Sequence, residues 1–79
     1  MRNLFVQTHP NGWEIKWEGA ERSSSTHSTK LEAINYAKAL AKNNATPTNP
    51  ISLKIKKLDG TIENEYSYPK IADPFPPKG

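Results

Sequence analysis

The chain contains no cysteine. Disulfide bonds and thiolate-bound metals are therefore excluded, and a reducing compartment such as the cytoplasm fits this composition. Hydrophobic residues make up only 34% of the 79 residues, and no stretch approaches the roughly 20 apolar residues of a membrane-spanning helix. The apolar run near the N-terminus is also too short for a secretory signal peptide. We therefore expect a cytoplasmic protein with no membrane segment and a thin core that leaves no room for a large internal cavity.

Motifs for catalysis and for metal binding are missing as well. The two histidines, His9 and His27, show no carboxylate–histidine spacing typical of a zinc or iron site. The serines at 23–25 lie near His27, but no Gly-x-Ser-x-Gly turn accompanies them to hold a nucleophile. The four glycines form no phosphate-binding loop. We therefore expect a protein that is not an enzyme and that needs neither cofactor nor metal.

The apolar residues that are present follow the period of β-strands in two places. Residues 13–18 alternate strictly between apolar and charged side chains, and residues 51–57 alternate again between apolar and polar side chains. Asn11-Gly12 predicts a tight turn that joins the first of these strands to a β-prone stretch at 3–8. Asp59-Gly60 predicts a second hairpin of the same kind. Two β-hairpins are therefore expected.

The second hairpin has a register in which charge and hydrophobicity agree. If Asp59-Gly60 is a two-residue loop, the predicted cross-strand pairs are Leu53 with Tyr66, Lys54 with Glu65, Ile55 with Asn64, and Lys56 with Glu63. Opposite charges directly across a strand pair stabilise it by about 0.2–1 kcal/mol. This agreement favours the register over its one-residue slips, which would exchange the two faces.

A helix is predicted between the two hairpins. Thr29 followed by Glu32 is a capping box, in which the threonine hydroxyl accepts from the Glu32 amide and the carboxylate returns to Thr29. The helix is expected over 30–43, before a loop at 45–50 that contains two prolines. Its apolar stripe consists of Ala33, Ile34, Ala37, Leu40 and Ala41.

These elements predict one two-layer α+β domain over 1–68, with a β-β-α-β-β antiparallel sheet and the helix packed on one face. Its sheet residues in the core are expected to be Trp13, Ile15, Trp17, Leu53 and Ile55. Residues 20–28 form a polar connection with room for a short strand at 24–27, and residues 69–79 form a proline-rich C-terminal tail. Apolar side chains on both faces of the strand at 3–8, together with unpaired edge strands, favour self-association.

A polar segment leads into the predicted helix and has the composition of an anion-binding site. Its candidate ligand-binding residues are Arg22, Ser24, Ser25, His27, Thr29 and Lys30. Free backbone amides, hydroxyl donors, the helix dipole and two cations would all face an anion there. The alternative is a polar connector with a helix cap, because the Glu32 carboxylate competes for the same amides. The formal net charge of +3 agrees with an anionic partner but is modest for a nucleic-acid-binding protein.

Several short motifs occur in order along the chain: Gly12-Trp13, Glu18-Gly19, Arg22-x-Ser24-Ser25-x-His27-x-Thr29, Glu32-Ala33-Ile34, Leu53-x-Ile55, Asp59-Gly60-x-Ile62, Ser67-Tyr68 and Asp73-Pro74-x-Pro76-Pro77. This ordered set resembles the small bacterial and phage family known as domain of unknown function 2188. The resemblance covers nearly the whole chain and implies no assigned activity. It does imply a shared polar cluster that the fold alone does not require, made of Arg22, Ser24, Ser25, His27 and Thr29.

Two hypotheses for the function follow. The first is a non-catalytic binding module for a phosphate-bearing anion, either nucleic acid or a small or signalling nucleotide, as in a phage-type sequestering protein. The polar segment from Arg22 to Lys30 would supply its contacts. The second is a structural or protein-interaction domain that self-associates and binds no small ligand. Salt-dependent binding of nucleic acid separates the two, because only the first hypothesis places phosphates on the protein.

Overall fold

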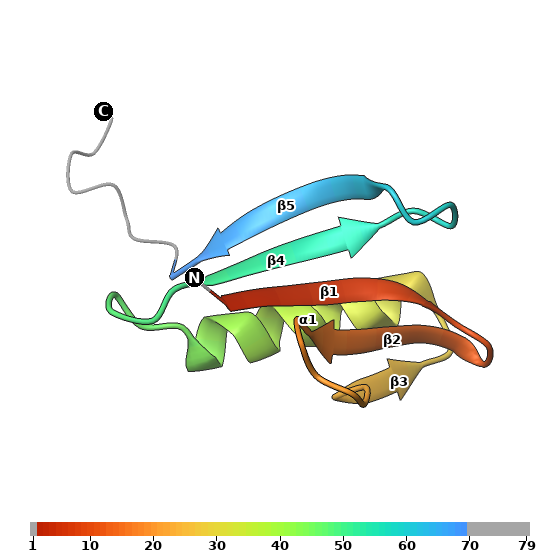
Figure 1. Cartoon of the computed structure of the whole chain (residues 1–79), viewed down its shortest axis with the longest axis horizontal. Coiled ribbons are helices and arrows are strands. Elements are labelled where there is room, and N and C mark those ends of the chain that lie inside the picture. The colour runs from red at the N-terminus through yellow and green to blue at the C-terminus, as the bar shows by residue number, and fades with distance from the viewer. Residues whose placement is uncertain (1, 70–79) are drawn as a thin grey trace.

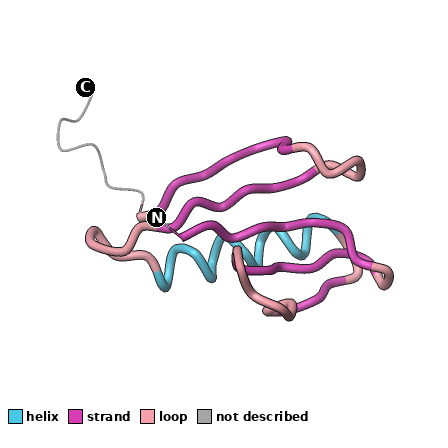
Figure 2. The backbone as a smooth tube through the Cα atoms, in the orientation of Figure 1, coloured by secondary structure: helices cyan, strands magenta, loops and turns pink. Residues whose placement is uncertain are grey.

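The chain forms a single sheet of five strands with one helix across it. The computed structural model describes residues 2–69. Its elements are β1 (Arg2–His9), β2 (Gly12–Trp17), β3 (Ser25–His27), α1 (Lys30–Asn44), β4 (Ile51–Lys56) and β5 (Ile62–Tyr68). The helix lies along one face of the sheet and leaves the other face open (Figures 1 and 2). The α+β class is therefore confirmed, whereas the predicted proline-rich tail at 69–79 lies outside the described residues except for Pro69.

The order of the strands is β3-β2-β1-β4-β5, and the sheet is mixed. β1 pairs with β4 in parallel, so the prediction of a fully antiparallel sheet is wrong. The cause is the short strand β3, which reverses the chain once more after β2 and therefore runs in the same direction as β1. α1 then returns the chain to the end of the sheet where β1 starts, and β4 leaves in the direction of β1 (Figure 1).

The second hairpin keeps most of its predicted register. The pairs Leu53–Tyr66, Lys54–Glu65 and Ile55–Asn64 are confirmed. Lys56 pairs with Ile62 instead of Glu63, because the register shifts between Ile55 and Lys56. The turn is longer than two residues: the Lys57 amide donates to the Thr61 carbonyl at 2.7 Å, and the extra residue is absorbed as a bulge. Glu63 is thereby released from the ladder.

The core fills the space between α1 and the sheet. Three alanines of the helix are fully buried, Ala33, Ala37 and Ala41. The buried residues of the sheet are Leu4, Val6, Ile15, Ile51, Leu53, Ile55 and Tyr68. Trp13 and Trp17 lie on the predicted face but are only half-buried, at the border of this core. They do not form its centre because β2 is followed only by the three-residue strand β3, whereas β1 and β4 are flanked by long strands.

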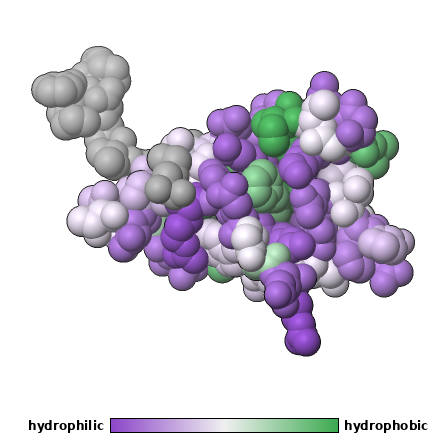
Figure 3. Space-filling model, viewed as in Figure 1, coloured by the Kyte–Doolittle hydropathy of each residue, from purple (hydrophilic) through white to green (hydrophobic). Residues whose placement is uncertain are grey.

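The open face of the sheet is mainly hydrophilic (Figure 3). Side chains alternate between faces along a strand, so the partners of the buried positions point away from α1. One continuous row on this face crosses four strands and consists of Lys16, Phe5, Lys54 and Glu65. Ile62, which is 40% exposed, pairs with Lys56 on the same face near the hairpin end.

Candidate functional site

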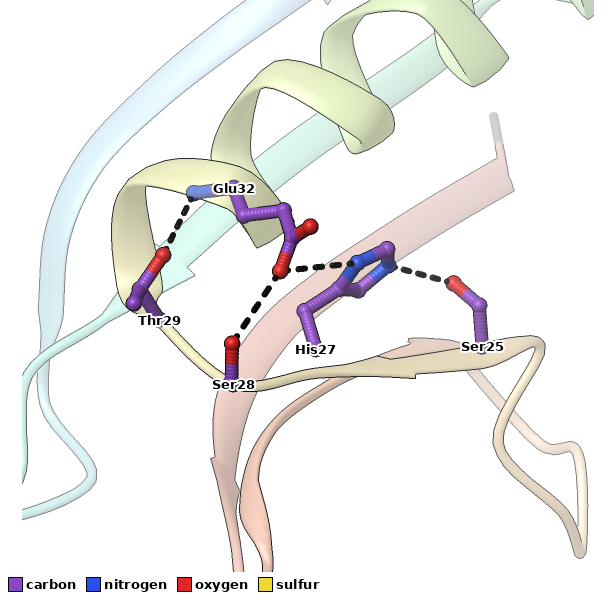
Figure 4. A network of polar contacts seen from close by, with 5 residues as sticks. All are labelled: Ser25, His27, Ser28, Thr29 and Glu32. Atoms are coloured by element: carbon purple, nitrogen blue, oxygen red, sulfur yellow. Dashed lines mark hydrogen bonds and ion pairs between the residues drawn. The ribbon is translucent and has the colours of Figure 1, made fainter.

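The start of α1 is held by a network of polar side chains (Figure 4). The Thr29 hydroxyl accepts a hydrogen bond from the Glu32 amide at 3.1 Å, as the capping box predicts. The Glu32 carboxylate is used differently from the prediction: it accepts from the Ser28 hydroxyl at 3.4 Å and lies 3.9 Å from His27 Nδ1. On its other side, the His27 ring bonds to the Ser25 hydroxyl at 2.9 Å.

This network places a carboxylate where the predicted anion would lie. The Glu32 side chain is 59% exposed, whereas the His27 side chain is only 11% exposed. The His27 ring packs at 4.9 Å from the Tyr36 ring, which tilts across it at 47°. The His27 ring is therefore anchored between β3 and α1, and the Glu32 carboxylate places a negative charge in the first turn of the helix, where the helix dipole favours it.

Lys30, the cation predicted at the helix start, is also engaged. Its ammonium forms an ion pair with Glu63, the residue that the bulge in β5 releases. The same ammonium lies 5.3 Å from the ring centroid of Trp13. Lys30 thus ties the first turn of α1 to the far edge of the sheet and to β2, so its charge is already partly neutralised within the domain.

Arg22 and Ser24 remain directed to solvent, and both are exposed. Within residues 2–69, the Arg22 guanidinium forms no ion pair or side-chain hydrogen bond. The Ser24 amide donates to the Ile15 carbonyl at 2.6 Å, which fixes the backbone of the segment along β2. The neighbouring Ser23 hydroxyl donates to Glu14, a residue of the open face. The structure therefore brings four of the six candidate residues into the network or the helix start and leaves Arg22 and Ser24 outside it.

Removing the helix cap tests the structural part of this segment. Thr29→Ala is expected to lower the free energy of unfolding by about 0.5–2 kcal/mol, because the Glu32 amide loses its acceptor. Thr29→Ser keeps an acceptor and should restore most of the loss. Thr48→Ala is the matched control, since this exposed loop hydroxyl approaches only Thr46, at 3.4 Å. Urea denaturation of the three variants measures the difference, and equal losses for Thr29→Ala and Thr48→Ala would contradict the capping role.

A second group of candidate residues lies on the open face and was not predicted from the sequence. Phe5 stands on the central strand β1, with Lys16 beside it on β2 and Lys54 beside it on β4. The Lys56 ammonium lies 4.6 Å from the centroid of the Phe5 ring. These four residues are called the lysine–phenylalanine cluster below. In the described part of the chain, none of its three lysines forms an ion pair.

Three carboxylates lie near this cluster. Glu65 stands directly across from Lys54 on β5, without an ion pair to it in the described range, and the other two are hydrogen-bonded. Glu14 accepts hydrogen bonds from Ser23 and from Gln7 Nε2, the latter at 2.6 Å. Burial alone would raise the pKa of Glu14, but these hydrogen bonds, together with the charges of His9 and Lys16, outweigh it and hold the pKa below the usual value of 4.5. Glu18 accepts from Asn3 Nδ2 at 2.7 Å. Glu14 and Glu18 are thus bonded to neutral donors. Lys16 interacts with Glu14 only through its charge, and no cluster lysine forms an ion pair with either carboxylate.

Other kinds of site find no support among the described residues. Residues 2–69 contain no group of three or more histidine, aspartate and glutamate side chains that could hold a metal ion. The same part of the chain has no pocket. Its one helix is neither long enough nor apolar enough to cross a bilayer. Any ligand bound within this range would therefore lie on an exposed surface.

The sheet, its single helix and the network at the helix start define a small α+β domain with one covered and one open face. The chain belongs to DUF2188, a family of uncharacterized proteins conserved in bacteria, whose profile matches residues 5–68. The predicted resemblance is thus confirmed.

One curated relative shows how much of a longer protein this domain covers. The chain is 35% identical over 60 residues to the uncharacterized protein YdaT of Bacillus subtilis strain 168. The match covers 76% of this chain and 37% of YdaT, so the chain spans little more than a third of that relative's length. No solved structure gives a significant match to the chain.

Proposed function

We propose that this domain is a non-catalytic binding module for a phosphate-bearing anion, and that the open face of the sheet is its main binding surface. The observation that carries the proposal is the lysine–phenylalanine cluster. Its three lysines stand on one side of the sheet around Phe5. None of them forms an ion pair within residues 2–69, although Glu65 lies across from Lys54. Unpaired lysines on a flat face attract phosphate more strongly than lysines already held in ion pairs.

The shape of the surface favours an extended ligand over a small one. No pocket is present in residues 2–69, so a single nucleotide would have little surface to bury. Lys16 and Lys54 stand on β2 and β4, which are separated by β1 and therefore lie about 10 Å apart at the usual strand spacing. Lysine charges spread over this distance can contact more than one phosphate of a nucleic-acid strand. Nucleic acid fits this arrangement better than a free nucleotide does.

The polar segment before α1 has a divided role in this proposal. Arg22 and Ser24 are exposed beside β2 and extend the binding surface, since a guanidinium can donate two parallel hydrogen bonds to one phosphate. The other candidate residues of the segment, Ser25, His27, Thr29 and Lys30, hold it in place through the network and the ion pair with Glu63. They would support the contacts of Arg22 and Ser24 more than make their own.

Fluorescence anisotropy with labelled nucleic acid at several salt concentrations tests the proposal. We expect binding that weakens steeply with salt, and each of Lys16→Ala, Lys54→Ala and Lys56→Ala should reduce the salt slope by about 0.7–0.9, the value for one phosphate contact. The triple variant is expected to lose roughly 30-fold in affinity at low salt, because three exposed charge contacts of about threefold each, or ~0.65 kcal/mol, multiply. Lys42→Ala is the control, because this lysine lies in the last turn of α1.

The competing hypothesis is a structural or interaction domain that self-associates. Absence of salt-dependent binding to single-stranded DNA, duplex DNA and RNA, together with a dimeric mass in sedimentation, would favour it over the proposal. Two features speak against it. The open face is mainly hydrophilic (Figure 3). The edge strand β5 carries the exposed Glu65, whose charge opposes pairing between two copies of this edge.

A further inference from the structure

We infer that the open face binds single-stranded nucleic acid, with a base stacked on Phe5 and the neighbouring phosphates on the cluster lysines. This inference rests on the proposed function and specifies its ligand. It requires three things of the surface: an aromatic ring that a base can reach, cations arranged around that ring, and few donors that would select particular bases.

The position of Phe5 meets the first requirement. Four other aromatic side chains of the sheet, at 13, 17, 66 and 68, lie on the face covered by α1. Phe5 is therefore the one aromatic residue on the open face within residues 2–69, and it stands on the central strand. It is half-buried, so its ring is anchored among its neighbours while part of it remains accessible. Base–aromatic stacking uses this kind of platform on a sheet.

The lysines around Phe5 meet the second requirement. Lys16 and Lys54 are its direct neighbours on the two adjoining strands, one on each side. Lys56 places its ammonium over the ring, at 4.6 Å from the centroid. A lysine side chain is long and flexible, so a base can displace this ammonium from the ring while the charge moves to the adjacent phosphate. The ring and the cations can then act on one nucleotide together.

The amides of the open face meet the third requirement. Gln7 Nε2 donates to Glu14 at 2.6 Å, and Asn3 Nδ2 donates to Glu18 at 2.7 Å. Both side chains that could read base edges next to Phe5 already use an amide hydrogen within the domain. Recognition would then depend on stacking and on phosphate contacts, which every base and every nucleotide provides. We expect weak preference among sequences.

The same geometry disfavours duplex DNA. In a duplex the bases are stacked on one another, so phosphates could meet the lysines but no base face could meet Phe5. A single strand can turn a base out at no such cost. The carboxylate of Glu65 on β5 repels phosphates from that edge, which leaves the central strands β1, β2 and β4 as the path of the ligand.

The experiment compares a labelled oligothymidylate, a duplex of equal length and an abasic oligomer of equal length by anisotropy at one low salt concentration. The probe should exceed the roughly 4–16 nucleotides that a small single-strand-binding domain covers. We expect the oligothymidylate to bind about tenfold more tightly than either of the other probes. Phe5→Leu keeps the apolar volume without the ring and should weaken oligothymidylate binding about tenfold. Phe5→Tyr keeps the ring and should bind like the parent.

The outcomes separate this inference from the proposed function. Salt-dependent binding with equal affinity for all three probes, unchanged in Phe5→Leu, would overturn the stacking inference and leave the phosphate-binding proposal standing. No binding to any of them would overturn both. If thermal unfolding shows that Phe5→Leu does not fold, the abasic oligomer decides with the unaltered protein: equal affinity for it and for oligothymidylate overturns stacking, and tenfold weaker binding supports it.

Discussion

Leu53→Ala is expected to lower the free energy of unfolding by about 2–5 kcal/mol, a large part of the roughly 4–12 kcal/mol available to a chain of this length. Leu53 is fully buried and lies on β4, between Leu4 of β1 and Tyr66 of β5. Truncation removes three carbons from the middle of the core. The sheet is fixed by hydrogen bonds on both sides of β4, so it cannot collapse into the space that remains.

Leu58→Ala provides the matched control for this substitution. Leu58 is 80% exposed in the turn between β4 and β5, so the same change there should alter stability by no more than about 0.5 kcal/mol. Urea denaturation followed by the fluorescence of the half-buried tryptophans measures both variants. If the urea concentration at half-unfolding were as little changed in Leu53→Ala as in Leu58→Ala, the core would lie elsewhere.

Local parts of the fold could be predicted from the sequence, because neighbouring residues determine them. The predicted helix at 30–43 and the observed α1, Lys30–Asn44, differ by one residue, since Thr29 fixes its start through a hydrogen bond three residues away. The pair Leu53–Tyr66 was predictable because a tight turn connects two alternating strands. The length of that turn was not: Gly60 has a positive φ of 91° in the observed three-residue loop and would equally serve a two-residue one.

The order of the sheet depends on contacts that no local pattern contains. β3 has only three residues and no apolar alternation, so its own sequence does not predict a strand. It is a strand because it pairs with β2. Its extra reversal decides that β4 runs parallel to β1. Without that pairing the sequence gives no reason to place Phe5 beside Lys54. The lysine–phenylalanine cluster therefore became visible only in the folded chain.

The polar segment before α1 shows what composition alone can predict about a binding site. Its residue types predicted an anion site, and the two exposed members, Arg22 and Ser24, still suit that role. The partners of the others could not be predicted. Glu63 reaches Lys30 because of a bulge in a strand 33 residues later, and Glu32 turns toward His27 and Ser28 because β3 presents them to the helix start.

The second large loss of stability is expected when a buried side chain of α1 is enlarged. Ala37→Leu should lower the free energy of unfolding by about 1–3 kcal/mol, although it adds hydrophobic surface. Ala37 is fully buried in the middle of α1, between Ala33 and Ala41 on the same stripe. Three alanines in a row let the helix lie close to the sheet. A leucine in their centre must push α1 away or adopt a strained rotamer.

Ala39→Leu separates packing from helix propensity. Ala39 is exposed on the opposite side of α1, so the same substitution there changes intrinsic helix preference equally without meeting the sheet. We expect Ala39→Leu to stay within about 0.5 kcal/mol of the parent in urea denaturation, and Ala37→Leu to unfold at clearly lower urea. If Ala37→Leu were as stable as Ala39→Leu, space for three more carbons would exist between α1 and the central strands. The close packing that keeps α1 on one face and leaves the other face open would then need another explanation.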